Sequence, residues 1–247
     1  MEKYPLSKTV TDFVSTFTNS RYKSWEHCFL FFENEVYKKD ITEKTLDHAS
    51  LHLAFYLASW GMMRGSTFLL QSDYKVHKDL IERVLLNPIY EPLWNFNFLN
   101  PSKAEIDNYL SLLFDKTSGI IYQVTNAYTY NSQGEIGKPT DTLITKILMG
   151  TLGCTPAYDR YFMEGIAYVQ NNSKEDIKFV QRLSPDSLKA LVEFVNRNKD
   201  ELCFLNKKLD MEYPIMKLID MYFWTIGLNE EIERKKNNKS VINLLEV

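Results

Sequence analysis

The residue types best suited to chemistry gather in one stretch, GEIGKPTDTLITKILMGTLGCTPAYDRYF, at residues 134–162. Near its start, Gly134 and Gly137 precede Lys138, and glycines permit positive φ and a turn whose free backbone N–H groups can hold a phosphate. Near its end stands a single acid, Asp159. A carboxylate of this kind can stabilise the positive charge that develops on a sugar when its glycosidic bond breaks.

Two helices must position these residues. Apolar residues recur at helical spacing after Thr142, which predicts a helix that starts at Thr142 and ends at Gly153. Pro156 then starts another helix, with Asp159 in its first turn. An acid in a first turn is also favoured by the helix dipole alone, so a purely structural role for Asp159 is the alternative interpretation.

The order of these features resembles the helix-hairpin-helix DNA glycosylase superfamily. The resemblance covers residues 134–162 only, and the spacing from Thr142 through Pro156 to Asp159 is similar to that of the adenine-mismatch branch. It implies that Asp159 is the catalytic carboxylate and that a base is flipped out of the DNA into a pocket. It further implies DNA contacts from these residues: Gly134, Gly137, Lys138, Thr142 and Lys146.

The stretch also departs from that superfamily. Two extra residues near Pro139 separate the hairpin from Thr142, Leu143 replaces a small residue, and Asp141 occupies the position of the lyase lysine. No cysteine cluster for an iron–sulfur centre follows. The resemblance therefore implies a monofunctional, cofactor-free hydrolase of a damaged, mismatched or modified base, and a role in defence against modified phage DNA is compatible with it.

A second stretch, ASWGMMRGSTFL, combines two glycines with an arginine in an apolar context. One interpretation is a helix break that directs Arg64 and Ser66 toward a ligand or phosphate. The other is a kinked helix in which Arg64 pairs with a carboxylate. Together with the aromatic residues near Asp159, this stretch supplies the candidates for the base pocket: Trp60, Arg64, Ser66, Tyr158, Tyr161 and Phe162.

Two hypotheses of other classes stay open. His48 and His52 are four residues apart on one helical face, and His27 lies one helix earlier, which is compatible with a metal-dependent helical-bundle hydrolase. Ordinary surface or core histidines explain the same pattern. The chain also fits a non-catalytic helical binding or scaffold protein in which Asp159 only starts a helix.

The composition is that of a folded domain. The 247 residues are 45% hydrophobic and 14% aromatic, which supplies a sizeable core, and the net charge of −3 does not by itself favour nucleic-acid binding. Three widely spaced cysteines indicate reduced thiols. The sequence shows no signal core or bilayer-spanning stretch, so we expect a cytoplasmic protein without a membrane partner. The resemblance implies that its partner is DNA, and we expect a monomer.

Helical periodicity dominates the chain, and no strand pair with a turn dipeptide is found. Residues 1–247 are therefore expected to form one all-α domain of two lobes, residues 1–130 and 131–247, with a helix-hairpin-helix-like element and a central cleft. Local signals place the helix boundaries. The expected starts and stops are Thr42, Gly61, Asp73, Pro88, Asn100–Pro101 and Ser184–Pro185.

Overall fold

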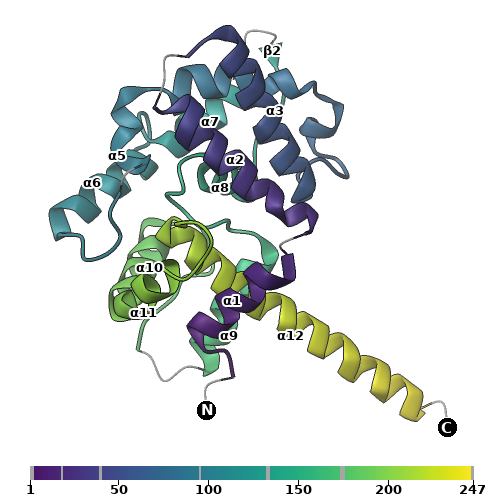
Figure 1. The fold of residues 1–247 in the computed structure, drawn as a ribbon. Coiled ribbons are helices and arrows are strands. Elements are labelled where there is room, and N and C mark those ends of the chain that lie inside the picture. The colour runs from purple at the N-terminus through teal and green to yellow at the C-terminus, as the bar shows by residue number, and fades with distance from the viewer. Residues whose placement is uncertain are drawn as a thin grey trace. The chain divides into compact units, whose positions relative to one another are not determined.

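The fold is all-α, as expected from the periodicity (Figure 1). The computed structural model describes residues 3–17, 19–38, 41–94, 96–131, 134–172 and 176–245. The helices are α1 (Leu6–Phe17), α2 (Ser24–Phe31), α3 (Glu43–Ser59), α4 (Lys78–Leu80), α5 (Glu91–Trp94), α6 (Lys103–Phe114), α7 (Ile120–Thr129), α8 (Asp141–Thr151), α9 (Arg160–Asn172), α10 (Pro185–Arg197), α11 (Lys199–Asn206) and α12 (Ile215–Leu245).

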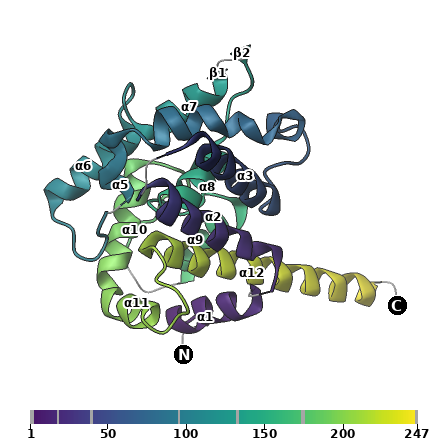
Figure 2. The ribbon, with the colours of Figure 1, turned by 45° about the horizontal axis from the view of Figure 1, so that its top comes forward.

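One short strand pair joins α7 to α8, although the sequence showed no sign of it. In it, β1 (Tyr130–Asn131) pairs antiparallel with β2 (Gly134–Glu135) at the end of α7 (Figure 2). Within the described ranges no helix is long and apolar enough to cross a membrane. The three cysteines are free thiols.

The chain divides into two compact units at a place that differs from the expected lobes. Unit 1 comprises residues 1–15 and 158–247, and unit 2 comprises residues 16–157. The N-terminal helix belongs to unit 1 because its buried face packs there: the ring of Phe13 meets Trp224 of α12 edge-on, with centroids 5.7 Å apart. This division differs from the expected lobe boundary at residue 130, and the two expected lobes with a central cleft stay predictions.

Several helix ends in unit 2 follow their local signals. Thr42 caps α3 by accepting a hydrogen bond from the Thr45 N–H. At the other end of α3, Gly61 adopts φ +78°, its N–H bonds the Ala58 carbonyl, and the Met62 N–H bonds the Leu57 carbonyl. This pair of bonds is the Schellman motif that glycine favours, so the predicted stop at Gly61 is confirmed.

Two helices of unit 2 begin at other residues than predicted: α6 begins later in the sequence and α8 begins earlier. The α6 helix begins after Ser102, whose side chain and Glu105 form a capping box, and not at Asn100–Pro101. The α8 helix begins after Thr140, whose hydroxyl oxygen accepts the Leu143 N–H at 3.3 Å, and not at Thr142. In both cases a second hydroxyl or amide residue nearby offered a competing cap.

Unit 1 is organised around the packing of α9 against α12. A Cβ atom at Gly165 of α9 would lie 1.8 Å from the Phe223 carbonyl oxygen, and one at Gly227 of α12 would lie 2.0 Å from the Tyr161 carbonyl oxygen. The two backbones therefore approach each other through paired glycines. Beyond this crossing, α12 extends past the other helices of its unit (Figures 1 and 2).

Candidate functional site

A pocket of about 460 Å³ in unit 2 brings together the two stretches that the sequence singled out separately. One wall is the loop after α3, with Arg64 and Ser66. The other wall is the segment that leads into α8, with Gly137 and Lys138. The complete lining is Gly61, Met62, Arg64, Ser66, Thr67, Phe68, Gly137, Lys138, Pro139, Thr140 and Leu143. We call it the Arg64–Lys138 pocket.

Gly61 positions the arginine of this pocket. The guanidinium of Arg64 folds back over the Gly61 backbone, so that a Cβ atom at residue 61 would lie 3.3 Å from Arg64 Cζ. The left-handed φ of Gly61 and this close approach both favour glycine. The predicted helix break is therefore confirmed, whereas a ligand contact of Arg64 stays a prediction.

Gly137 joins the two walls by a close contact and not by a phosphate-binding turn. A Cβ atom at Gly137 would lie 2.7 Å from the Phe68 ring, and the Gly137 N–H donates to the Tyr128 carbonyl at 3.4 Å. Gly134 lies in β2, and neither glycine has a positive φ. The expectation of a free amide in a tight turn is therefore corrected for Gly137, and it stays a prediction for Gly134.

The pocket is cationic. Arg64 and Lys138 are exposed, and neither forms an ion pair with the side chains that the structure describes, which do not include Glu135. The pocket also contains the start of α8, an 11-residue helix whose N-terminal end carries partial positive charge. Two acidic residues, Glu135 and Asp141, each lie three residues from Lys138 in the sequence, and Asp141 is in the first turn of α8. The alternative in which Arg64 is paired with a carboxylate is not observed among the described residues.

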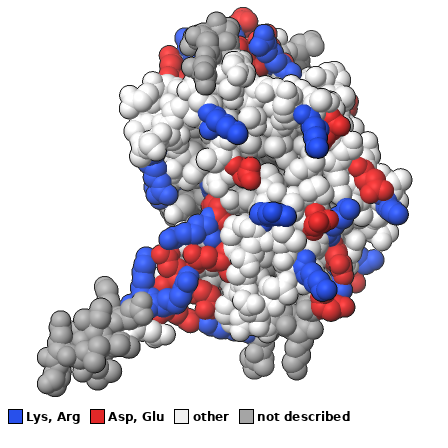
Figure 3. Space-filling view, turned by 180° about the vertical axis from the view of Figure 1, so that it is seen from behind, with Lys and Arg blue, Asp and Glu red and all other residues white. Residues whose placement is uncertain are grey.

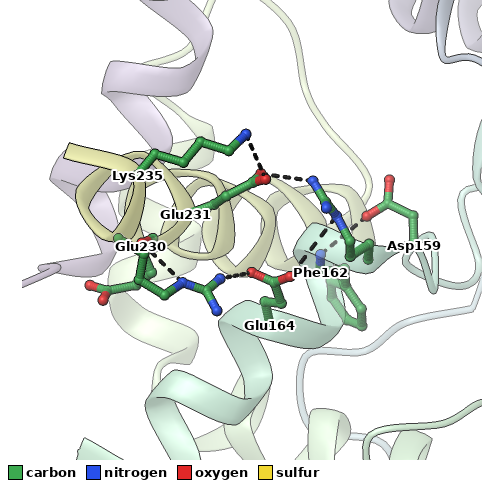
Figure 4. Close-up of polar contacts among 8 residues, drawn as sticks. Asp159, Phe162, Glu164, Glu230, Glu231 and Lys235 are labelled. Atoms are coloured by element: carbon green, nitrogen blue, oxygen red, sulfur yellow. Dashed lines mark hydrogen bonds and ion pairs between the residues drawn. The ribbon is translucent and has the colours of Figure 1, made fainter. Parts of the chain in front are cut away.

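Asp159 lies in unit 1, immediately before α9. Its Oδ1 accepts the backbone N–H of Phe162 at 3.1 Å (Figure 4), and its carbonyl accepts the Met163 N–H at 3.0 Å. Asp159 therefore caps α9 and precedes its first turn, where the sequence had placed it inside the turn. The side chain is half-buried, so the carboxylate is not enclosed in the core.

Charged residues tie the start of α9 to α12. Glu231 accepts from Arg160 at 2.7 Å and pairs with Lys235 at 2.8 Å, and Glu164 pairs with Arg234 (Figure 4). Hydrogen bonds from Lys235 and from the Tyr161 hydroxyl lower the pKa of the Glu231 carboxyl to about 2. Figure 3 shows basic and acidic side chains interleaved on this exposed part of α12.

Four of the predicted site residues are buried in the protein core: one predicted DNA contact, Lys146, and three predicted pocket residues, Trp60, Tyr158 and Phe162. Lys146 is 1% exposed, and its ammonium lies 4.8 Å from the centre of the Trp60 ring, so the predicted phosphate contact is corrected to a cation–π contact in the core. Trp60 and Phe162 are core residues, and the Tyr158 hydroxyl lies 2.7 Å from that of Ser187 in the interior of unit 1.

Two other predicted residues have partial exposure. Tyr161 is half-buried and stacks edge-on against Trp224, with its ring under the Arg160 guanidinium. Thr142 is half-buried in the first turn of α8. Of the pocket candidates, only Arg64 and Ser66 therefore line the Arg64–Lys138 pocket.

The metal-site hypothesis lacks a third ligand. In the described part of the chain, no group of three or more His, Cys, Asp or Glu residues could hold a metal ion. His52 stacks on Phe31 at 4.1 Å, and its pKa is lowered first by burial and then by the nearby charges of His27 and His48. These contacts place His52 against an aromatic ring, as expected for an ordinary histidine of a helical core.

Sequence reasoning missed part of the pocket lining. Thr67 and Phe68 continue the Arg64 loop, and Pro139 and Thr140 were read only as an insertion before the helix. The sequence offered one signal for this part of the lining. Thr140 is a residue type that often caps a helix, and its hydroxyl oxygen accepts the Leu143 N–H at the start of α8. No local pattern indicates that two loops some 70 residues apart share a pocket.

Comparison of the chain with protein-family models, with curated proteins and with solved structures finds no match. The candidate site therefore depends on its own geometry and on the resemblance over residues 134–162.

Proposed function

We propose that this protein is a monofunctional DNA glycosylase-like hydrolase that cleaves the N-glycosidic bond of a damaged or modified base, with Asp159 as its carboxylate. The observation that supports the proposal is the environment of Asp159. Its side chain is half-buried at the start of a 13-residue helix and is oriented by the Phe162 N–H. A negatively charged side chain at a helix start also interacts favourably with the helix dipole.

The chemistry needs few protein groups. As the bond to the base breaks, positive charge develops on the sugar, and an oriented carboxylate stabilises that charge and directs a water molecule to the anomeric carbon. Water supplies the oxygen that replaces the base, and the departing base takes up a proton. No lysine nucleophile is needed, in agreement with Asp141 at the lyase position and with the buried Lys146.

The test is base release from DNA by the wild-type protein and two variants of Asp159. DNA carrying damaged bases and phage DNA carrying modified bases serve as substrates, and abasic sites are counted. We expect Asp159→Asn to reduce the rate at least 100-fold, because it removes the charge. Asparagine still caps a helix well, so the melting temperature should stay within about 2 °C of the wild type.

Asp159→Ala is the matched control, since it removes both the charge and the cap. It should also lose activity and should lower the free energy of unfolding by about 1 kcal/mol. An Asn variant as active as the wild type, or the absence of abasic sites on every substrate, would overturn the proposal.

A non-catalytic binding protein is the second candidate, and the capping hydrogen bond of Asp159 favours it. In that case the Ala variant loses stability, the Asn variant behaves like the wild type, and no substrate releases a base. Binding to DNA, if present, would then be unaffected by Asp159→Asn.

A further inference from the structure

The Arg64–Lys138 pocket is a separate feature from Asp159 and has its own chemistry. It lies entirely within unit 2, and every lining residue comes from residues 61–68 or 137–143. Arg64 lines it from the loop after α3 and Lys138 from the segment before α8, and neither forms an ion pair with the side chains that the structure describes. Two exposed cations directed into one concavity are the usual means by which proteins hold a phosphate.

The neutral polar groups of the pocket suit the same ligand. Ser66, Thr67 and Thr140 supply hydroxyl groups around the two cations. Arginine can bind two phosphate oxygens at once, while lysine acts as a point charge. The Arg64 guanidinium packs against Gly61, and Gly137 packs against the Phe68 ring. These two contacts fix the positions of the loops that carry the cations.

The size and the apolar part of the pocket indicate that the phosphate carries an organic group. A volume of about 460 Å³ is within the range of pockets for organic ligands and far exceeds the need of an inorganic ion. Met62, Phe68 and Leu143 form an apolar part of the lining. A nucleobase is a flat, partly apolar group that such a surface accommodates.

We infer that the Arg64–Lys138 pocket binds the phosphate of a nucleotide, with Arg64 and Lys138 as the phosphate ligands and the nucleoside against the apolar lining. The choice of a nucleotide among organic phosphates rests on the proposed function, whereas the phosphate site itself does not. The nucleotide is either a free mononucleotide or one unit of a DNA strand, and both present the same phosphate chemistry.

Calorimetric titration of the full chain tests the inference. The probes are deoxyadenosine 5′-monophosphate, inorganic phosphate and deoxyadenosine. We expect the monophosphate to bind at least tenfold more tightly than either of the other two. Arg64→Ala and Lys138→Ala should each weaken its binding about tenfold or more, because each removes a charge-assisted contact.

Two further variants separate a specific site from general surface charge. The double variant Arg83→Ala/Lys116→Ala removes one arginine and one lysine that are exposed in unit 2 but do not line the pocket, and it should bind like the wild type. Asp141→Asn removes the nearby negative charge and should tighten binding severalfold. A merely structural role of Arg64 or Lys138 would not produce this gain.

Competition with an unmodified DNA duplex distinguishes the two sources. If the pocket holds a DNA backbone phosphate, the duplex displaces the monophosphate. The number of counterions released on duplex binding, measured from its salt dependence, should then fall by about one when Arg64 or Lys138 is removed. If it holds a free nucleotide, the duplex does not displace the monophosphate. Either result supports a nucleotide phosphate in the pocket.

Two results would overturn the inference. One is a monophosphate that binds no better than deoxyadenosine. The other is an equal effect of the pocket variants and of Arg83→Ala/Lys116→Ala. Failure of base release with intact nucleotide binding would instead contradict the role of Asp159, so the two proposals can fail separately.

Discussion

At the scale of single residues, the structural roles of Gly61, Gly137 and Asp159 depend on the atoms that surround them. Gly61 is needed for its left-handed φ, whereas Gly137 is needed because the Phe68 ring leaves no room for a side chain. Asp159 provides a cap for α9 whether or not it also acts on a substrate. Residue type alone could not separate these cases.

A buried histidine predicts a pH dependence of stability. His77 is fully buried, its Nδ1 lies 2.5 Å from the Tyr128 hydroxyl, and burial lowers its pKa from 6.5 to about 3. The unfolded chain therefore binds a proton between pH 6.5 and 3 that the folded chain does not. The stabilising contribution of neutral His77 is complete above pH 6.5 and is lost as the pH falls toward 3.

We expect this group to lower the free energy of unfolding by about 1.4 kcal/mol for each pH unit below 6.5. Urea unfolding at pH 6.5 and pH 5.5 measures the slope, and His77→Gln should lack this component. His48→Gln, at an exposed position, is the control and should keep the wild-type slope. Equal slopes for all three proteins would contradict a neutral, buried His77.

At the scale of elements, the contact between α9 and α12 dominates unit 1. Its geometry depends on Gly165 and Gly227, since each backbone faces a carbonyl of the other helix at a distance that excludes a Cβ atom. The ion pairs of Glu164 and Glu231 lie along the same contact but involve exposed arginines and lysines. Such exposed pairs contribute little compared with backbone packing.

Gly165→Ala should therefore destabilise the protein by at least 1–3 kcal/mol, roughly the cost of overpacking, even though alanine favours helices. Chemical unfolding followed by circular dichroism measures the change. Asn171→Ala, at an exposed position of α9, should change the free energy of unfolding by less than about 0.5 kcal/mol. A Gly165 variant as stable as this control would mean that the helices do not pack this closely.

At the scale of the whole molecule, the chain leaves unit 1 after residue 15 and returns to it at residue 158. The N-terminal helix therefore packs into the same core as the C-terminal helices. Leu6, Val10 and Phe13 form its buried face. The Ser7 hydroxyl also donates to Glu201 of α11 at 2.6 Å.

Phe13→Ala tests this partition. Loss of the buried ring should cost about 3–5 kcal/mol. Hydrogen exchange should then show loss of protection mainly in residues 158–237, with residues 16–157 less affected. Ser15→Ala, at an exposed position of the same helix, should leave the exchange pattern unchanged. Equal loss of protection in both units would contradict the division.

The sequence by itself determined the helical class and several helix ends. The caps at Thr42 and Ser184 and the glycine stop at Gly61 depend on hydrogen bonds within a few residues, so they can be read locally. Where two cap residues stood close together, as at Thr140 and Thr142, the local signal was ambiguous.

Only the tertiary structure decided which residues share a site. The burial of Lys146 under Trp60, the contact of Gly137 with Phe68, and the union of Arg64 with Lys138 in one pocket all join segments far apart in the chain. Such contacts depend on how the helices pack, and no periodicity or cap encodes them within one segment. The same packing joins residues 3–15 to the C-terminal helices and so sets the boundary between the units.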